Sequence, residues 1–219
     1  MVPILYENSD FLIVNKPINI DFHGELGLLS RLREQSSQLY GVHRLDKATS
    51  GLMVFAKTKD SEKALKSLFQ ERQIQKFYIA LTDIKPKKKM GQVKGDLIKA
   101  RSGSYKLTRS MKNPSFTKFI SYNYLSSLRM IIFRPFTGKT HQLRVVAQSL
   151  GASILGDIRY KGTSADRMYL HAFKLSFTLF NKDYDFTCLD TSGEFFEPLK
   201  TWNFSQIDWA YFIKETRKL

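Results

Sequence analysis

The sequence of 219 residues predicts an α+β protein that folds as a single domain, residues 1–219. From Lys76 to Pro135 the chain consists of short segments rich in β-branched and aromatic residues, separated by Gly, Pro, Asn and Ser. Their short spacing favours antiparallel pairing of strands. Two other segments carry apolar residues at helical spacing, and no repeat or low-complexity linker divides the chain. We therefore expect one strand-rich folding unit with a few helices.

The first 75 residues are expected to contain both strands and helices. "PILYEN" at 3–8 and "FLIVNK" at 11–16 predict two strands, and "GLMVFAK" at 51–57 predicts a buried one. "LGLLSRLREQ" at 26–35 is weakly helical. A helix is predicted over 61–72, behind Asp60 or Ser61 as its cap, because four apolar residues share one face. These four are Ala64, Leu65, Leu68 and Phe69.

Later in the chain, six segments predict strands and one predicts a terminal helix. The strands are "KFYIALT" (76–82), "QVKGDLIK" (92–99), "SFTKFISYNYL" (115–125), "LRMIIFRP" (128–135), "YLHAFKLSFTLF" (169–180) and "KDYDFTCLD" (182–190), and the helix lies within 206–219. The alternation around Cys188 favours a small core residue over a nucleophile.

The helix expected over 140–151 has two distinct faces. Its apolar face is formed by Leu143, Val146, Ala147 and Leu150, with Gly151 suited to end the helix. The opposite face carries His141, Arg144 and Gln148. We expect these three side chains to point outward together.

The charge of the chain predicts a polyanionic partner. Lys and Arg number 35 against 20 Asp and Glu, which gives a net charge of +15. Residues 84–112 hold ten of the bases and one acid, which is the pattern of a surface that neutralises phosphates. For "KPKKK" at 85–89, a solvated lysine-rich loop is the alternative. No signal peptide or membrane-length apolar run occurs, so we expect a cytoplasmic protein that spans no membrane.

Several kinds of site are disfavoured by the motifs. Gly138-Lys139-Thr140 resembles part of a phosphate-binding loop, but Phe133 stands where that loop requires glycine. The four histidines lack the spacing of a zinc site, and one cysteine forms no internal disulfide. A Ser-His-Asp triad could combine Ser50, a histidine and Asp46, but the nucleophile-elbow motif is missing. We expect no metal or cofactor.

One carboxylate stands out within this basic chain. Asp46 lies in "HRLDKATSGLMVFAK" at 43–57, between Arg44 and Lys47 and just before a predicted buried strand. A surface salt bridge is the ordinary role for such an acid. An arginine partner in a pocket would instead keep the carboxylate ionised at neutral pH, available as a nucleophile or base.

This stretch resembles the active-site signature of the RluA-type pseudouridine synthases. "DFLIVNKP", "KFYIAL" and "PFTGKTHQLRVVAQSLGASILGDIRY" are similar to further blocks of that family, in the same order. The resemblance implies a mixed, mostly antiparallel sheet flanked by helices, with an active cleft between two halves of one domain. It also implies an enzyme that isomerises uridine in ribosomal or transfer RNA to pseudouridine.

The same resemblance implies a role for each candidate residue. Asp46 would be the essential catalyst, with Arg144 as its ion-pair partner and Tyr78 packed against the uracil. Arg44 would fill the gap left by a flipped base, and Leu143 would pack beneath the site. We expect further RNA contacts from His43, Lys139 and His141.

Two departures and two alternatives stand beside this interpretation. The family usually has arginine where Lys139 stands, and a small residue and glycine where Ile18-Asn19-Ile20 follows "NKP". The chain begins almost on the first motif, without the small RNA-binding domain that many relatives carry, so RNA choice is expected to rest on the catalytic domain alone or on a partner. We expect a monomer. The alternative functions are an inactive RNA-binding or ribosome-assembly factor and a metal-dependent nuclease.

Overall fold

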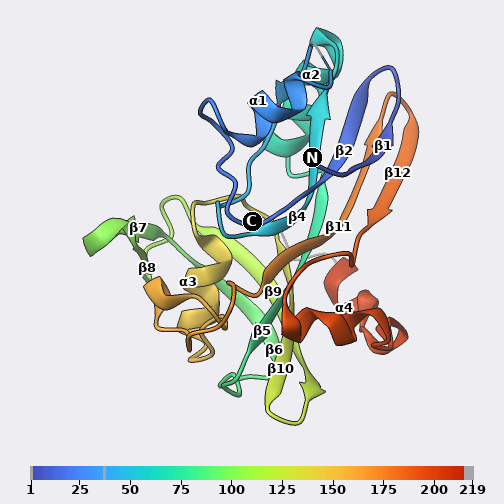
Figure 1. The fold of residues 1–219 in the computed structure, drawn as a ribbon. Coiled ribbons are helices and arrows are strands. Elements are labelled where there is room, and N and C mark those ends of the chain that lie inside the picture. The colour runs from blue at the N-terminus through green and yellow to red at the C-terminus, as the bar shows by residue number, and fades with distance from the viewer. Residues whose placement is uncertain (1, 37, 215–219) are drawn as a thin grey trace.

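The structure, a computed structural model, describes residues 2–36 and 38–214 (Figure 1). Its α-helices are α1 (Leu28–Arg33), α2 (Lys59–Gln70), α3 (Gln142–Ser149) and α4 (Trp209–Ile213). Its strands are β1 (Ile4–Glu7), β2 (Phe11–Lys16), β3 (Tyr40–Gly41), β4 (Ser50–Ala56), β5 (Gln75–Thr82), β6 (Met90–Gly95), β7 (Leu97–Lys99), β8 (Tyr105–Leu107), β9 (Ser115–Leu125), β10 (Leu128–Pro135), β11 (Leu170–Leu179) and β12 (Lys182–Thr187).

Ten of these strands form one long sheet in the order β1-β2-β4-β11-β5-β10-β9-β6, with β12 beside β11 and β3 beside β4. Every pairing is antiparallel except that of β4 with β11, which is parallel at Ser50 and His171. This parallel pair joins a half built on β2 and β4 to a half built on β5, β9 and β10 (Figure 1). The predicted mixed, mostly antiparallel sheet is confirmed.

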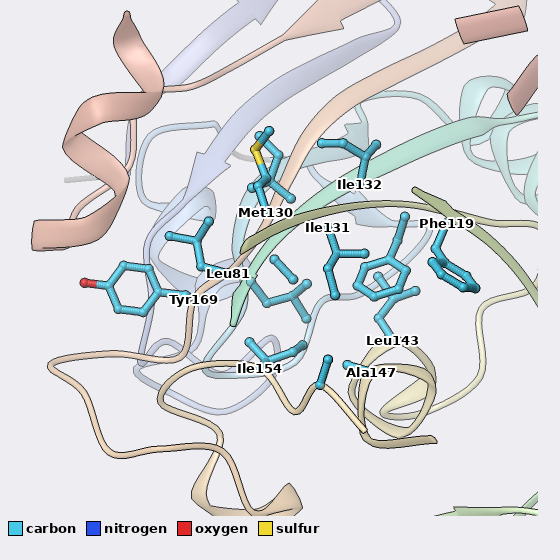
Figure 2. Close-up of a cluster of buried hydrophobic side chains, with 14 of the residues drawn as sticks. Leu81, Phe119, Met130, Ile131, Ile132, Leu143, Ala147, Ile154 and Tyr169 are labelled. Atoms are coloured by element: carbon cyan, nitrogen blue, oxygen red, sulfur yellow. The ribbon is translucent and has the colours of Figure 1, made fainter. Parts of the chain in front are cut away.

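Each half of the sheet has its own hydrophobic packing. In the larger half, β5, β9 and β10 pack against α3 and the segment around Ile154, as Figure 2 shows. In the smaller half, α1 contributes Leu28 and Leu32 to one buried cluster, and α2 contributes Leu65 to another. Residues of β2 and β4 alternate between these two clusters, because successive strand residues face opposite sides of a sheet.

The predicted elements agree with the structure for most of the chain, and β9 and β10 coincide with the expected ranges. The helix expected at 61–72 begins earlier, at Lys59, because its N-cap is Thr58 rather than Asp60 or Ser61, and Thr58 forms a capping box with Ser61. The strand expected over 92–99 is divided at Gly95, which has a φ of 150°. Asp96 follows, and its carboxylate accepts hydrogen bonds from Ser110 and from the backbone of Lys112 and Asn113.

After this break, β7 and β8 pair with each other and with no other described strand, as a two-stranded sheet that projects beside α3 (Figure 1). The expected terminal helix is short, and residues 215–219 of that prediction lie outside the described chain. Cys188 is buried in the core as predicted, where burial raises the pKa of its thiol. None of the described helices is long and apolar enough to cross a membrane.

Candidate active site

A cavity of about 450 Å³ opens between the two halves of the sheet. It is lined by the loop between β3 and β4, the last turn of α2, the start of β5 and the segment that joins β10 to α3. The structure brings all eight predicted site residues to its wall. They are His43, Arg44, Asp46, Tyr78, Lys139, His141, Leu143 and Arg144.

The loop that carries Asp46 is held from below by the buried side chain of Lys16. The Lys16 ammonium donates to the carbonyl oxygens of Pro17, Ile20 and Lys47 at 2.8, 3.1 and 3.1 Å. Burial lowers the pKa of Lys16 to about 8, and the nearby Asp46 acts in the opposite direction. The hydrogen bonds of Lys16 thereby join the segment "DFLIVNKP" to the segment that carries Asp46.

Asn19 explains how the chain accommodates its departure from the family pattern after "NKP". Its φ is 63°, in the left-handed region that glycine adopts freely and asparagine tolerates. The Asn19 N–H donates to the carbonyl of Lys47 at 2.8 Å. The loop therefore reaches the Asp46 segment without glycine.

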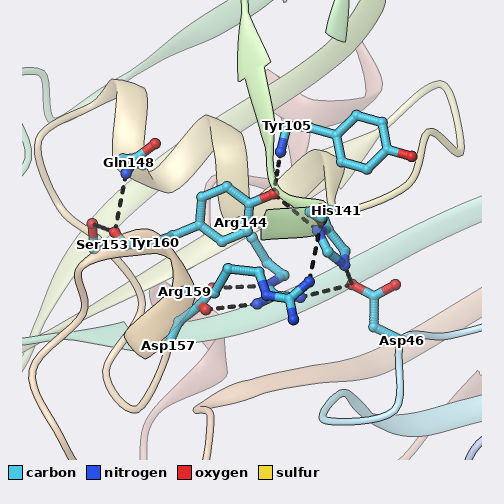
Figure 3. Close-up of polar contacts among 10 residues, drawn as sticks. Asp46, Tyr105, His141, Arg144, Gln148, Ser153, Asp157, Arg159 and Tyr160 are labelled. Atoms are coloured by element: carbon cyan, nitrogen blue, oxygen red, sulfur yellow. Dashed lines mark hydrogen bonds and ion pairs between the residues drawn. The ribbon is translucent and has the colours of Figure 1, made fainter. Parts of the chain in front are cut away.

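The Asp46 carboxylate lies at the edge of the cavity and is engaged only loosely (Figure 3). Its Oδ2 atom is 3.6 Å from Arg144 Nη1 and 3.9 Å from His141 Nε2. In the described part of the chain, no group is hydrogen-bonded to this carboxylate. Its oxygen lone pairs consequently remain available to a bound molecule.

Arg144 makes a much tighter contact with Asp157, which sequence reasoning did not identify as a site residue. Its Nε and Nη2 atoms donate to the two Asp157 oxygens, each at 2.7 Å. Arg144 is 8 % exposed and Asp157 2 %. The expected ion pair between Arg144 and Asp46 is present, but at 3.6 Å it is longer than the contact of Arg144 with Asp157. The "GD" in "ILGDIRY" was the only available signal for Asp157.

The polar face of α3 does not point outward, contrary to the sequence prediction. Tyr160 contacts all three polar residues. His141 Nδ1 meets its hydroxyl, the Arg144 guanidinium lies over its ring at 4.8 Å, and the Gln148 amide donates to its backbone carbonyl. Helical periodicity separates a polar face from an apolar one. It does not reveal that a distant segment covers the polar face.

Tyr160 also sets the orientation of the His141 ring. The Tyr160 hydroxyl accepts the backbone N–H of Tyr105 at 2.9 Å, so its own proton is available to His141 Nδ1, which is also 2.9 Å away. Burial lowers the pKa of His141, which favours the neutral ring. Neutral His141 with Nδ1 as acceptor carries its proton on Nε2, the atom that faces Asp46.

Tyr78 and Leu143 belong to the apolar part of the cavity wall. Leu143 is buried in the core at the start of α3, and Tyr78 packs against the same core from β5. Burial raises the pKa of the Tyr78 hydroxyl, with the negative charge of Asp46 adding to this effect. Tyr78 is therefore a neutral aromatic surface at physiological pH.

The remaining predicted residues lie around the rim in different environments. Arg44 is exposed and Lys139 donates to Asn113 at 2.7 Å. His43 Nε2 accepts the backbone N–H of Val54 at 3.0 Å, and its ring stacks on Phe69 at 4.5 Å. Burial lowers the pKa of His43 to about 3, so this ring is neutral.

The serine of the alternative triad belongs to a separate buried cluster. Ser50 Oγ lies 2.8 Å from His171 Nδ1 and accepts a hydrogen bond from Arg167 Nη2 at 2.6 Å. His171 Nε2 in turn donates to the carbonyl of Cys188. Ser50 and His171 are 2 % and 0 % exposed and lie outside the cavity, so this pair supports the β4–β11 junction.

His171 makes the stability of the fold sensitive to acid. Burial lowers its pKa to about 4, whereas an unfolded chain takes up the proton near 6.5. The unfolded state therefore binds more protons between these values, and stability falls as pH decreases from 6.5 to 4, by up to roughly 3 kcal/mol from this group. We expect His171→Gln to weaken that pH dependence in urea unfolding measured from pH 4.5 to 7.5. Exposed His23→Gln should not change it, and equal slopes in both variants would refute the assignment.

Comparison with known proteins identifies the family of this site. Residues 10–149 match a family model described as RNA pseudouridylate synthase. The chain belongs to the RNA pseudouridylate synthase family. The RluA-type resemblance and the predicted enzyme class, RNA pseudouridine synthase, are thereby confirmed.

The present chain covers nearly the whole length of one relative and a smaller share of others. An uncharacterized RNA pseudouridine synthase of Haemophilus influenzae is 44 % identical, with 97 % of each chain covered. Ribosomal large subunit pseudouridine synthase C of Rickettsia bellii is 34 % identical over 82 % of this chain and 65 % of its own. Among solved structures, human RNA pseudouridylate synthase domain containing 1 matches with a TM-score of 0.74 and 26 % identity over 86 % of this chain and 83 % of its own.

The family assignment applies to the part of the chain that forms most of the cavity wall. Within residues 2–36 and 38–214, no group of three His, Cys, Asp or Glu side chains is arranged to hold a metal ion. The matched region 10–149 contains all eight predicted site residues but ends before Asp157 and Tyr160.

Proposed function

We propose that this synthase isomerises uridine in ribosomal RNA to pseudouridine, with Asp46 as its essential catalytic carboxylate. The observation that carries the proposal is the state of Asp46: it borders a cavity, beside an arginine, yet none of the described groups hydrogen-bonds its oxygens. The carboxylates of Asp96 and Asp157, by contrast, both accept hydrogen bonds within this protein. The alternative of an inactive RNA-binding factor offers no reason for this arrangement.

The reaction requires no partner for its electron or atom balance. The bond between the ribose carbon and the uracil nitrogen breaks, the freed base turns, and the ribose carbon bonds to carbon five of the same ring. The hydrogen on carbon five is released as a proton, and the nitrogen regains one. Asp46 provides the carboxylate that acts as the nucleophile or the base in these steps.

The cavity suits a nucleotide that has left its stacked position. A uridine inside stacked RNA is inaccessible, and extruding it costs a few kcal/mol. Tyr78 offers a neutral ring against which the uracil packs, a contact of about 1–3 kcal/mol. Leu143 lies beneath the base, and exposed Arg44 enters the space that the base has left.

The positive rim supports an RNA partner. The cavity is lined by the cationic side chains of Arg44, Arg72 and Lys139. His43 and His141 also line it, as neutral rings that offer hydrogen-bonding groups. The basic β7–β8 sheet lies beside α3. Contacts with phosphates release counterions, which supplies affinity that depends on salt. We infer that the enzyme binds RNA through this surface as a single-domain monomer.

Large-subunit ribosomal RNA is the substrate class that the relatives favour over transfer RNA. Several of them, from Rickettsia and Vibrio species, are named ribosomal large subunit pseudouridine synthase C. The chain spans 60–65 % of the length of these two relatives. The substrate is therefore proposed from the shared catalytic region.

The test is tritium release from RNA labelled at carbon five of uridine. We expect the purified protein to release tritium from large-subunit ribosomal RNA, and not from transfer RNA, in the presence of EDTA. Binding of both RNAs without release would favour the inactive binding factor. Strand cleavage that EDTA abolishes would favour the metal-dependent nuclease instead.

A further inference from the structure

Two carboxylates share one guanidinium beside the cavity, and they share it unequally. Arg144 directs Nε and Nη2 at Asp157, both at 2.7 Å, and leaves Nη1 for Asp46 at 3.6 Å (Figure 3). The guanidinium is rigid and planar, so two fixed nitrogens determine where the third one lies. The position of Nη1 relative to Asp46 is accordingly set by Asp157.

Asp157 is itself fixed by the backbone around it. Its N–H donates to the carbonyl of Ile154, and its carbonyl accepts the N–H groups of Tyr160 and Gly162. Gly156 precedes it with a φ of 80°, and a Cβ there would lie 1.7 Å from the carbonyl oxygen of Arg167. The backbone is therefore constrained on both sides of Asp157, which fixes the position from which its side chain meets Arg144.

We propose that Asp157 is a positioning residue of the active site, which rests on the proposed function of Asp46. It holds Arg144 through two charge-assisted hydrogen bonds. Asp46 then keeps an electropositive neighbour without being locked into a bidentate ion pair. The carboxylate that meets the substrate stays free, and the one that is buried carries the structural contact.

The alternative is that the Arg144–Asp157 pair serves stability alone. The two roles differ in what they predict for turnover. A purely structural pair affects how much protein is folded, and it leaves the activity of the folded fraction unchanged. A positioning pair changes turnover in protein that is fully folded.

Asp157→Asn is the decisive variant, because it has nearly the same shape. The asparagine amide places an NH₂ group against one Arg144 N–H group, which replaces a hydrogen bond by repulsion. We expect kcat for tritium release to fall about 100-fold, since displacement of a reacting group by about 1 Å has this effect. KM for the RNA should change less than about threefold, because the surface that binds phosphates is untouched. Activity is measured well below the melting temperature of each variant.

Two further variants separate positioning from stability. Arg144→Lys keeps the charge but lacks the planar fork, so its kcat should fall as in Asp157→Asn. Glu62→Gln removes a carboxylate that pairs with Lys59 and Lys66 on α2, and it should leave kcat unchanged. An unchanged kcat in folded Asp157→Asn would overturn the proposal.

A spectroscopic measurement tests the inference without any turnover. The Arg144 side-chain N–H groups that bond Asp157 should exchange slowly with solvent in NMR spectra of the free protein, with assignment by their loss in Arg144→Lys. They should exchange rapidly in Asp157→Asn. Equally slow exchange in that variant would refute the positioning role. If the native protein releases no tritium, the proposed function fails, while the exchange experiment still decides whether Asp157 holds Arg144.

Discussion

Asp46→Asn is expected to lower tritium release at least about 1,000-fold, while the protein remains folded and binds RNA. An amide is neither a nucleophile nor a base at neutral pH, so either catalytic role is lost. The carboxylate is partly exposed, and its contacts with Arg144 and His141 are 3.6 and 3.9 Å long. Losing contacts of this kind should cost less than about 1 kcal/mol in the free energy of unfolding.

Asp21→Asn is the matched control for this experiment. Asp21 pairs with Lys47, the residue that follows Asp46, at 3.0 Å, and both side chains are more than half exposed. This variant makes the same change of charge close to the site, and its activity should stay within about twofold of the native protein. Substantial release by Asp46→Asn, or equal losses in both variants, would contradict the assignment.

The local elements of this fold could be predicted because their sequence patterns are local. Residues 115–125 and 128–135 are rich in β-branched and aromatic residues and are separated by Ser126 and Ser127, which predicts two strands with a turn between them. The parallel pairing of β4 with β11 could not be predicted in this way, because it joins Ser50 to His171 across most of the chain. That pairing joins the two halves that border the cavity. The prediction of a cleft between two halves therefore came from the family resemblance, and the pairing itself was not predicted.

The site residues were predictable to the extent that motifs carry them. Asp46 and Arg144 come from two motifs, and they lie within 3.6 Å of each other. Asp157 was not predicted, because its contact with Arg144 depends on how the segment after α3 folds back over that helix, and no local sequence pattern shows this. A polar helix face has the same spacing whether solvent or another segment covers it.

The buried pair leads to the second large expected effect, on stability as well as activity. Arg144→Met leaves Asp157, which is 2 % exposed, as a carboxylate without its cation. Removal of one partner of a buried ion pair typically costs about 3–5 kcal/mol, because the remaining charge is uncompensated. We expect a loss of this size in the free energy of urea unfolding at pH 7, together with loss of tritium release.

The double variant Arg144→Met with Asp157→Leu separates these two losses. Replacing both members of a buried ion pair by apolar residues is often neutral for stability, and the methionine sulfur can pack on the Tyr160 ring now covered by the guanidinium. Unfolding free energy should return to within about 1 kcal/mol of the native value. Tritium release should stay absent, because Asp46 has still lost its cationic neighbour. Recovery of activity along with stability would mean that Arg144 serves only the fold, and the cavity would then need another cation to act on Asp46.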